Sequence, residues 1–403
     1  MLDLLKTLAV LSFVIILLRR RVFIGTVMAA GSLMLALLYL TPLSDLLLAL
    51  QRALFSLRAI EMTVMLVCTM IMENILRSTG TMRRMVTSVG QLFPDPRFVM
   101  AAMPATIGML PSVGGAVFSA PMVAEASEGL ALSAEQKAFV NYWYRHAWEY
   151  VSPLYPGIIL VAGMTGRSFR ELALAHSPYA VAQLVVGLFF CFRGIRGTVI
   201  SRGQTPLRAA TDFSQAISPI IIPLLLVVVV GLNPGLALGG AVILLFLWHR
   251  YPLARVAETL RESLSPKSLF LVAGVLFFQE TLGITGAMQG VSGFLTASGL
   301  PLVPIIIAIP LLAGAMTGLT VAFVGISFPF LLPLMSSGGS VDPGLLALAF
   351  GSGFCGVMLS PLHLCLVLTG EYFNADFGSV YRRLLVPSAL VLAAGFIPYC
   401  LYS

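Results

Sequence analysis

Ten stretches of the sequence are apolar over about the length of a membrane-spanning helix. A helix needs about 20 mostly apolar residues to cross the hydrocarbon core of a bilayer. The ten stretches cover residues 2–18, 22–40, 59–76, 134–165, 178–192, 212–231, 234–250, 268–285, 342–370 and 385–402. Only 10% of the residues are charged, against about 25% in soluble globular chains. The sequence therefore predicts an all-α polytopic membrane protein and excludes a soluble enzyme or a disordered chain.

Four segments carry proline, glycine or serine within apolar sequence. Two of the stretches, 134–165 and 342–370, are too long for one span and contain prolines in mid-run, so each predicts a broken helix. Residues 98–125 and 301–335 are rich in Gly, Pro and Ser, which is typical of two half-length helices around a polar tip. Irregular backbone at membrane depth is tolerated only where it is buried in protein or lines a cavity. We therefore interpret 98–125 and 301–335 as re-entrant hairpins.

The net charge of +7 comes from short clusters of Lys and Arg between the apolar runs. Such clusters are typical of cytoplasmic loops rather than of a nucleic-acid surface. With Arg19–Arg21 placed in the cytoplasm, 18 of the 24 Lys and Arg residues fall on the cytoplasmic side and 5 fall outside, which leaves Arg145 within a span. This bias predicts a multi-pass protein of the inner (plasma) membrane with both termini outside the cytoplasm.

The second half of the sequence repeats short motifs of the first half about 208 residues later. The matched pairs are Ser112 with Thr320, Phe118–Pro121 with Ile326–Pro329, Val151–Tyr155 with Leu359–His363, Glu73 with Glu280, and Thr79–Met82 with Thr285–Met288. Each half would hold five transmembrane helices and one re-entrant hairpin, and because five is odd the second half would insert in the opposite direction. The sequence predicts two inverted-topology repeats, 1–205 and 206–403, an arrangement typical of transporters with a midplane site.

This architecture resembles the ion-transporter superfamily, which includes citrate, dicarboxylate, gluconate and arsenite permeases. The run Leu110–Ala116 followed by Ser119–Pro121 is most similar to an uncharacterised branch of prokaryotic integral-membrane proteins. The resemblance in architecture covers essentially the whole chain, and it implies a scaffold, a mobile transport domain, elevator-type motion and often a homodimer. The sodium-coupled dicarboxylate members carry Ser-Asn-Thr at both hairpin tips. Here the tips are Ser112–Gly115 and Thr320–Phe323, so sodium coupling and dicarboxylate specificity do not carry over.

Small and hydroxyl-bearing residues at the hairpins and breaks are candidates for substrate binding. Glycine lets a ligand approach the backbone closely, and half-helix N-termini direct partial positive charge at an anion. Pro153 and Pro361 each free the carbonyl four residues earlier, which offers ligands for a cation or water. The alternatives are close helix packing by small residues and kinks satisfied by neighbouring helices. The predicted substrate-binding residues are Ser112, Gly114, Gly115, Ser119, Arg145, Ser152, Thr320, Ser327 and Ser360.

Charged residues inside the apolar stretches are the second group of candidates. Arg145 and Glu149 are four residues apart, so they share a helix face, and His146 lies between them. A charge at the bilayer centre costs about 2.5–3.5 kcal/mol and usually marks function, and the forked guanidinium suits carboxylates and phosphates. An internal Arg145–Glu149 pair that only stabilises the bundle, or an interfacial position, is the alternative. The second half has the uncharged segment Gly353–Val357 at this place.

Titratable residues within or at the ends of spans are candidates for ion coupling. They are Glu149, His146, His363, Glu73 and Glu280. Positions at the membrane interface, or simple helix packing, are the alternative for the last three. The five cysteines lie in apolar stretches without a metal-binding spacing, so we interpret them as buried packing residues and expect no metal site.

Together these features predict a secondary active transporter of a small organic anion of the carboxylate type. No ATP-binding loop is present in the sequence, so the coupling ion is expected to be H⁺ or, second, Na⁺, with no other cofactor. The expected partners are the anionic substrate, membrane lipids and a second copy of the chain, and no nucleic acid. The alternatives are a lipid-carrier flippase, a channel or a cation exchanger. An enzyme is not expected, because no HExxH, GxSxG or CxxC motif occurs.

Overall fold

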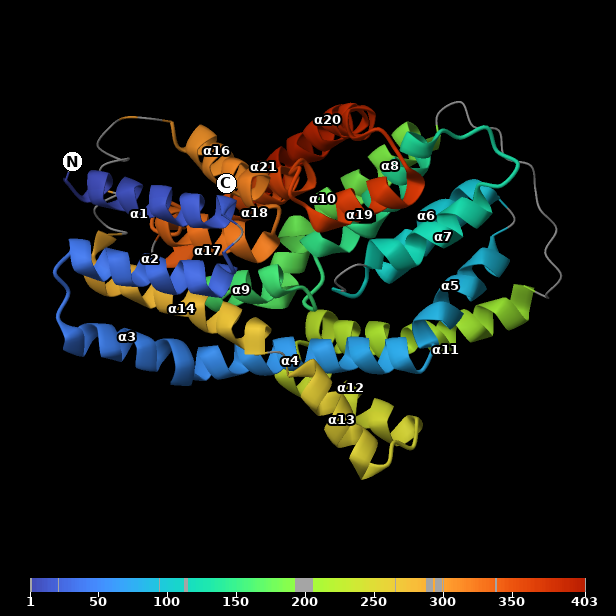
Figure 1. Cartoon of the computed structure of the whole chain (residues 1–403), viewed down its shortest axis with the longest axis horizontal. Helices are drawn as coiled ribbons and strands as arrows, with labels where there is room; N and C mark the ends of the chain where they lie inside the picture. The colour runs from blue at the N-terminus through green and yellow to red at the C-terminus, as the bar shows by residue number, and fades with distance from the viewer. Residues whose placement is uncertain are drawn as a thin grey trace.

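The chain folds into a bundle of α-helices with one short two-stranded ribbon (Figure 1). The computed structural model describes residues 2–402 apart from 21, 94, 112–114, 193–205, 265, 288–292, 294–298, 300 and 338. The strands are β1 (Ser336–Ser337) and β2 (Ser340–Val341), which pair antiparallel. The prediction of an all-α architecture is confirmed, since every other element among the described residues is helical.

The helices of the two halves follow one another in a similar order. The first half contains α1 (Leu2–Arg19), α2 (Ile24–Leu38), α3 (Leu43–Phe55), α4 (Leu57–Ser78), α5 (Thr81–Leu92), α6 (Pro96–Ile107), α7 (Gly115–Ala126), α8 (Ala134–Arg145), the 3₁₀ turn η1 (Ala147–Tyr150), α9 (Pro156–Thr165) and α10 (Phe169–Phe192). The second contains α11 (Pro206–Leu225), the π-helical turn η2 (Leu226–Val230), α12 (Pro234–Trp248), α13 (Leu253–Ser263), α14 (Pro266–Thr285), α16 (Leu302–Thr317), α17 (Thr320–Leu331), α18 (Pro343–Met358), α19 (Leu364–Phe373), α20 (Phe377–Ala394) and α21 (Phe396–Tyr402). Helices α9 and α19 begin 208 residues apart, as do α10 and α20, so the secondary structure recurs at the offset of the motifs.

Matched helices of the two halves pack with exchanged partners. Helix α2 packs on α14 while α4 packs on α12, and α7 packs on α19 while α9 packs on α17. Each half therefore supplies packing neighbours for the other half. The opposite insertion of the halves in a bilayer stays a prediction.

Among the residues that the structure describes, four helical segments are long and apolar enough to cross a membrane. They are Leu57–Ser78, Phe169–Phe192, Leu207–Val230 and Phe377–Tyr402, and shorter apolar helices lie between them. Large apolar side chains such as Leu236, Leu247 and Trp248 are exposed on the surface of the bundle, as expected where lipid covers it. The chain is a membrane protein.

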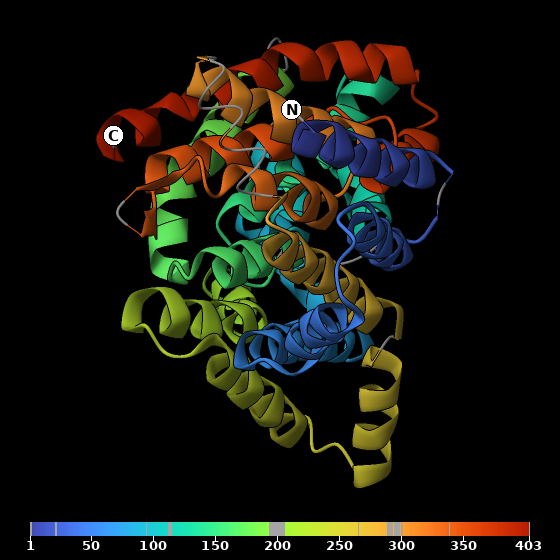
Figure 2. The ribbon, with the colours of Figure 1, turned by 90° about the vertical axis from the view of Figure 1, so that its left-hand side faces the viewer.

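The helices form two layers with α9 and α17 between them (Figures 1 and 2). The lower layer in Figure 1 contains α2, α3, α4, α12, α13 and α14, and the upper layer contains α6, α7, α8, α10, α16, α18, α19 and α20. Helix α9 packs on α4, and helix α17 packs on α14. These two short helices therefore connect the upper layer to the lower one.

Both long apolar stretches are interrupted at a Ser-Pro pair. In the first, α8 passes through η1 to Ser152 and Pro153 before α9 begins, and in the second α18 ends shortly before Ser360 and Pro361. Ser152 Oγ accepts a hydrogen bond of 3.3 Å from the N–H of Leu154, and Ser360 Oγ accepts one of 3.2 Å from the N–H of Leu362. The serine hydroxyls thus stabilise the turn where proline has ended the helical ladder.

Sequence analysis did not predict α3 and α13. Each helix is only 11–13 residues long and mixes apolar with charged side chains. A search for apolar runs of about 20 residues therefore passes over them, although both belong to the lower layer.

Candidate functional site

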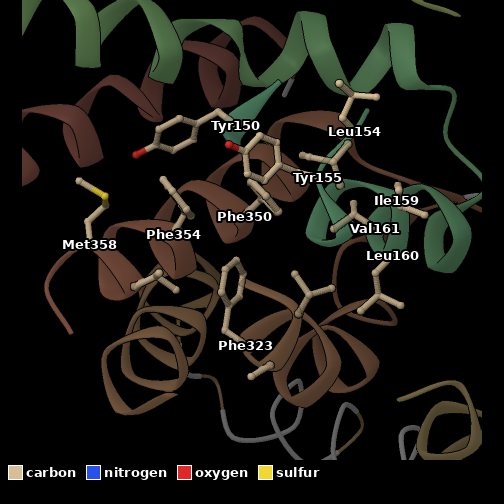
Figure 3. Packing of buried hydrophobic residues seen from close by; sticks show 14 of the residues in the cluster. Tyr150, Leu154, Tyr155, Ile159, Leu160, Val161, Phe323, Phe350, Phe354 and Met358 are labelled. Carbon is tan, nitrogen blue, oxygen red and sulfur yellow. The ribbon is translucent and has the colours of Figure 1, made fainter. Parts of the chain in front are cut away.

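The two helix breaks lie next to each other in an aromatic part of the core. Figure 3 shows Tyr150 and Tyr155 of the first break beside Phe350 and Phe354 of α18, with Phe323 of α17 on the other side. The rings of Tyr150 and Phe354 meet edge to face with centroids 4.7 Å apart, and those of Phe323 and Phe350 lie 5.6 Å apart. This packing buries the polar side chains of both breaks.

Two histidines, one from each half, face each other across the breaks. His146 follows α8 and His363 precedes α19, and their Nε2 atoms are 3.0 Å apart. His146 is fully buried and His363 nearly so. The Nδ1 atom of His146 lies 2.6 Å from the carbonyl oxygen of Tyr142, and that of His363 lies 2.8 Å from the carbonyl oxygen of Gly318. The pair therefore joins the first break to the second and to the turn between α16 and α17.

Glu149 of η1 lies beside this pair. Its Oε1 atom is 3.8 Å from His146 Nε2, and its Oε2 atom accepts a hydrogen bond of 3.5 Å from Thr320 Oγ1. Thr320 is the first residue of α17. A Cβ atom on Gly157 would overlap Thr320 Cγ2, so the first turns of α9 and α17 touch, and the partial positive charges of both helix N-termini are close together.

Arg145 is the last residue of α8 and is only 2% exposed. Its guanidinium lies within hydrogen-bonding reach of Cys365 Sγ and within electrostatic range of Glu149 and Tyr155. Glu73 of α4 is also within electrostatic range. A buried charge is tolerated when polar groups surround it. We call Arg145, His146, Glu149, His363 and Cys365 the central polar cluster.

Tyr155 and His363 occupy equivalent positions in the two breaks. The Tyr155 hydroxyl donates hydrogen bonds of 2.5 and 3.3 Å to the carbonyl oxygens of Gly108 and Leu110, which follow α6. His363 reaches the carbonyl oxygen of Gly318, which stands 208 residues after Leu110. In both halves the residue after the Ser-Pro-Leu turn therefore binds backbone carbonyl oxygens just after the first helix of the preceding pair, α6 or α16.

Three metal-ligating atoms also come together in the central polar cluster. One ring nitrogen each of His146 and His363 and the Sγ atom of Cys365 all lie within 4.8 Å of one another, and this donor set suits soft transition metals. However, the guanidinium of Arg145 reaches the same sulfur. This fixed positive charge opposes the binding of a cation, so the residues present fit a metal ion poorly.

The structure brings together five of the residues proposed from the sequence. They are Arg145, His146, Glu149, Thr320 and His363. The Arg145–Glu149 pair considered from the sequence is not the closest contact of the carboxylate, because Glu149 lies against His146 and Thr320.

The remaining serines have their hydroxyls engaged locally. Ser152 and Ser360 stabilise the breaks, as described above. Ser119 lies in the second turn of α7 and donates to the carbonyl oxygen of Ala116 at 3.3 Å, and Ser327 of α17 donates to that of Phe323 at 2.5 Å. Both are fully buried, which favours the packing interpretation for these two.

Other proposed residues lie at the edge of the cluster or outside the described part. Gly115 is the first residue of α7, whereas Ser112 and Gly114 lie outside the described residues. Glu73 and Glu280 are half-buried in α4 and α14, and only for Glu73 does the structure record an interaction with Arg145.

Sequence analysis missed three residues around the cluster. The interpretation of all five cysteines as buried packing residues is wrong for Cys400, which is exposed, and Cys68 and Cys365 are only half-buried. Cys365 lies two residues after His363 and reaches both His146 and Arg145. Tyr142, one turn before His146, donates a hydrogen bond of 3.0 Å to the carbonyl oxygen of Met358. For Tyr142, the sequence feature that could have indicated a role was its place among several polar residues in the apolar stretch 134–165.

The third missed residue, Asn141, joins three helices near the start of α7. Its Nδ2 donates to the carbonyl oxygen of Ala116 at 3.0 Å and to Thr369 Oγ1 at 3.1 Å. Asn141 is fully buried. The contact connects α8 with α7 and α19, and it positions the first hairpin against the second break.

A small apolar cavity lies beside the cluster at the boundary of the two layers. Its walls come from α4 and α14 of the lower layer and from α9 and α17. Pro156 and Val321 belong to these walls, and they follow Tyr155 and Thr320 directly in the chain. The central polar cluster is therefore close to the surface along which the two layers meet.

Comparison with known proteins gives one family match and a fold shared with a solved structure. The profile of the family described as "Protein of unknown function (DUF401)" matches residues 2–402. No curated protein matches the chain significantly. Among solved structures, the chain is similar to the YdaH transporter of Alcanivorax borkumensis, with a TM-score of 0.52 and 14% identity over 86% of this chain and 87% of that chain. This similarity shows a shared fold.

Proposed function

Because the chain belongs to the DUF401 family and shares its fold with a transporter, we propose that it is a secondary active transporter of a small organic anion. The observation that carries this proposal is the burial of Arg145 where the two helix breaks meet. A cation buried in a membrane protein is costly and usually lies on a substrate or ion pathway.

The electrostatics of the site favour an anionic substrate. The guanidinium of Arg145 presents a fork that matches a carboxylate or phosphate. The N-termini of α9 and α17 lie in contact through Gly157 and Thr320, and α19 begins just after His363. These helix ends add partial positive charge. A cation exchanger is disfavoured for the same reason.

We assign the coupling ion to H⁺ ahead of Na⁺. His146, His363 and Glu149 are titratable, and they lie in direct contact at the buried centre. The hairpin tips also lack the Ser-Asn-Thr motif of the sodium-coupled relatives. Proton binding at these groups would change the net charge of the binding site and so its affinity for an anion. Coupling of transport to a proton gradient requires such a dependence.

The two-layer architecture supports alternating access of the elevator type. Helix α9 follows the first break and α17 follows the turn at Gly318, and the first turns of both helices line an apolar cavity between the layers. A sliding motion at this boundary would not require polar contacts to break there. We further propose that the halves are inverted repeats, as in the ion-transporter superfamily, that the termini face outside the inner membrane, and that the transporter is a homodimer.

The local geometry disfavours an intramembrane hydrolase. Such an enzyme needs a serine within hydrogen-bonding reach of a base. The imidazoles of His146 and His363 instead contact each other and backbone carbonyls. Ser119 donates within its own helix and Ser152 supports the turn after it, so neither serine is paired with a histidine.

A thermal-shift screen of purified protein tests the proposed function. Carboxylates, phosphonates and Na⁺ are added at several pH values, and a stabilising anion is then tested for uptake into proteoliposomes. We expect at least one anion class to raise the melting temperature of the wild type and not of Arg145→Gln. The matched control is Arg167→Gln, which removes an arginine that binds Glu171 at 2.8 Å and the carbonyl of Val341. Stabilisation that persists in Arg145→Gln would contradict the proposed site.

A further inference from the structure

The hydrogen bonds of His146 and His363 determine which ring nitrogen carries hydrogen. A carbonyl oxygen can only accept a hydrogen bond. Both Nδ1 atoms lie within 2.8 Å of a carbonyl oxygen, so both must be Nδ1–H donors. In a neutral imidazole the other nitrogen is then an acceptor with a lone pair.

The two acceptor nitrogens point at each other. The Nε2 atoms of His146 and His363 are 3.0 Å apart, which is the length of an N–H hydrogen bond. Two neutral rings with these tautomers would bring two lone pairs against each other, and two protonated rings would place two N–H groups and two positive charges there. One shared proton satisfies both nitrogens at once.

The other groups around the pair favour a proton over a metal ion. The titratable or charged groups that face it are Tyr142 and Arg145 from α8, Glu149 from η1 and Cys365 from α19. Helices α17 and α18 contribute the uncharged side chains of Thr320 and Phe354. Arg145 and one shared proton carry two positive charges, of which the Glu149 carboxylate, 3.8 Å from His146 Nε2, balances one. A divalent cation at the same place would add a further positive charge without a partner.

We infer that His146 and His363 form a single binding site that holds one proton between their Nε2 atoms. Because one histidine comes from each half of the chain, breaking this bond separates the two helix breaks, so the proton can couple to their relative motion. That the shared proton is the coupling ion rests on the proposed function, whereas its position between the rings does not. The two histidines then titrate as a pair rather than as separate sites.

Nitrogen-15 NMR of histidine-labelled protein in lipid bilayers tests the shared proton directly. The chain has 4 histidines, so few signals need assignment. We expect two rings with protonated Nδ1 and a scalar coupling across an Nε2–H–Nε2 bond. His146→Asn, whose amide can still donate to the Tyr142 carbonyl, should abolish this coupling and leave His363 as a neutral ring. His363→Asn should likewise abolish the coupling and leave His146 as a neutral ring.

His176 provides the matched control for these variants. It is fully buried, its Nδ1 lies 2.9 Å from the carbonyl oxygen of Tyr150, and its ring stacks on Phe350. We expect His176→Asn to leave the coupling intact. If the variants at 146 and 363 do not fold, the wild-type spectrum alone still tests the inference. A wild-type spectrum that shows two histidine rings without a shared proton would overturn it.

Two further measurements separate the competing explanations. A stoichiometric transition metal in protein purified without chelator would overturn the shared proton. For transport of a substrate identified in the thermal-shift screen, His146→Asn should lose the uptake driven by a pH gradient that His176→Asn keeps, and unchanged pH-driven uptake in His146→Asn would overturn the coupling role. If the NMR signal of the shared proton is present but no anion is transported, only the proposed function is contradicted. If an anion is transported but the spectrum shows two separate neutral rings, only the shared proton is contradicted.

Discussion

Gly108, at the end of α6, lies directly against the backbone carbonyl oxygen of Arg145, so that a Cβ atom at this position would overlap it. The equivalent contact in the second half joins Gly314 of α16 to the carbonyl oxygen of Gly353 in α18. Both contacts set the spacing between a hairpin helix and a broken helix. Only the first of them positions a charged residue of the central polar cluster.

This pair of contacts allows a matched test of the site. We expect Gly108→Ala and Gly314→Ala each to lower the free energy of unfolding by about 1–3 kcal/mol, because an added methyl group overpacks a tight contact. Gly108→Ala should in addition displace Arg145 and remove the thermal shift produced by the anion, whereas Gly314→Ala should keep it. Equal loss of the ligand shift in both variants would show that the spacing of the helices matters and the position of Arg145 does not.

Substitutions of Arg145 and Glu149 distinguish substrate binding from internal pairing. Arg145→Lys should bind the anion more weakly because the bidentate fork is lost, and Arg145→Gln should lose the anion-induced thermal shift. Glu149→Gln should still bind, with a flatter pH dependence of uptake. Melting temperature and ligand shift are measured for both single variants and for the double variant.

The internal-pair alternative predicts a different pattern for the same proteins. Removing one partner of a buried pair leaves the other charge unpaired and costs about 3–5 kcal/mol. Both single variants would then be destabilised alike and the double variant would recover. A double variant that regains stability and still binds the anion would assign both residues a structural role.

The hydroxyl of Thr320 provides a test of the cluster that leaves its charges in place. Thr320→Val keeps the methyl group that packs on Gly157 but removes the hydrogen bond to Glu149. Thr320→Ser keeps the hydroxyl and removes the methyl group. The loss of one such bond costs about 1 kcal/mol, so neither variant should unfold. We expect the pH profile of uptake to change in Thr320→Val and to persist in Thr320→Ser, and the reverse order would contradict the role given to the hydroxyl.

Much of the fold follows from local sequence patterns. Apolar runs predicted a helical membrane protein. The Ser-Pro pairs at 152–153 and 360–361 predicted breaks in the two over-long stretches, because proline removes a backbone donor. A Ser-Pro pair alone is not sufficient, since Ser177-Pro178 and Ser218-Pro219 lie inside α10 and α11. The helices α3 and α13 were missed because their amphipathic pattern suits a surface as well as a membrane boundary. The order of packing, with α2 on α14 and α9 on α17, depends on contacts between the halves.

The central polar cluster could be predicted only in part. Arg145, His146 and Glu149 attracted attention as charged residues in an apolar stretch. That His146 meets His363 could not be inferred, because the two residues are 217 positions apart and belong to different halves. Cys365 gave no signal of its own, since its neighbours in the sequence are apolar. Only the packing of the two breaks shows that its sulfur reaches Arg145.

The inverted-repeat proposal makes a prediction about accessibility in whole cells. In a background without the native cysteines, Arg20→Cys and Ile195→Cys should be protected from impermeant thiol reagents, because both positions belong to predicted cytoplasmic loops rich in arginine. Asn233→Cys should react, since it lies in the uncharged turn before α12. Asn233 Oδ1 accepts a hydrogen bond of 3.2 Å from Leu236 N, and losing this cap costs about 1 kcal/mol, which the fold should tolerate.

The three positions decide the orientation of the two halves together. Positions 20 and 233 occupy corresponding loops, between the first two helices of each half, so a parallel repeat would place them on the same side of the membrane. Permeabilised cells serve as the control, in which all three cysteines should react. Protection at 233, or reaction at 195 before permeabilisation, would contradict the inverted insertion. Either outcome would also contradict the odd number of crossings that the sequence predicts for the first half.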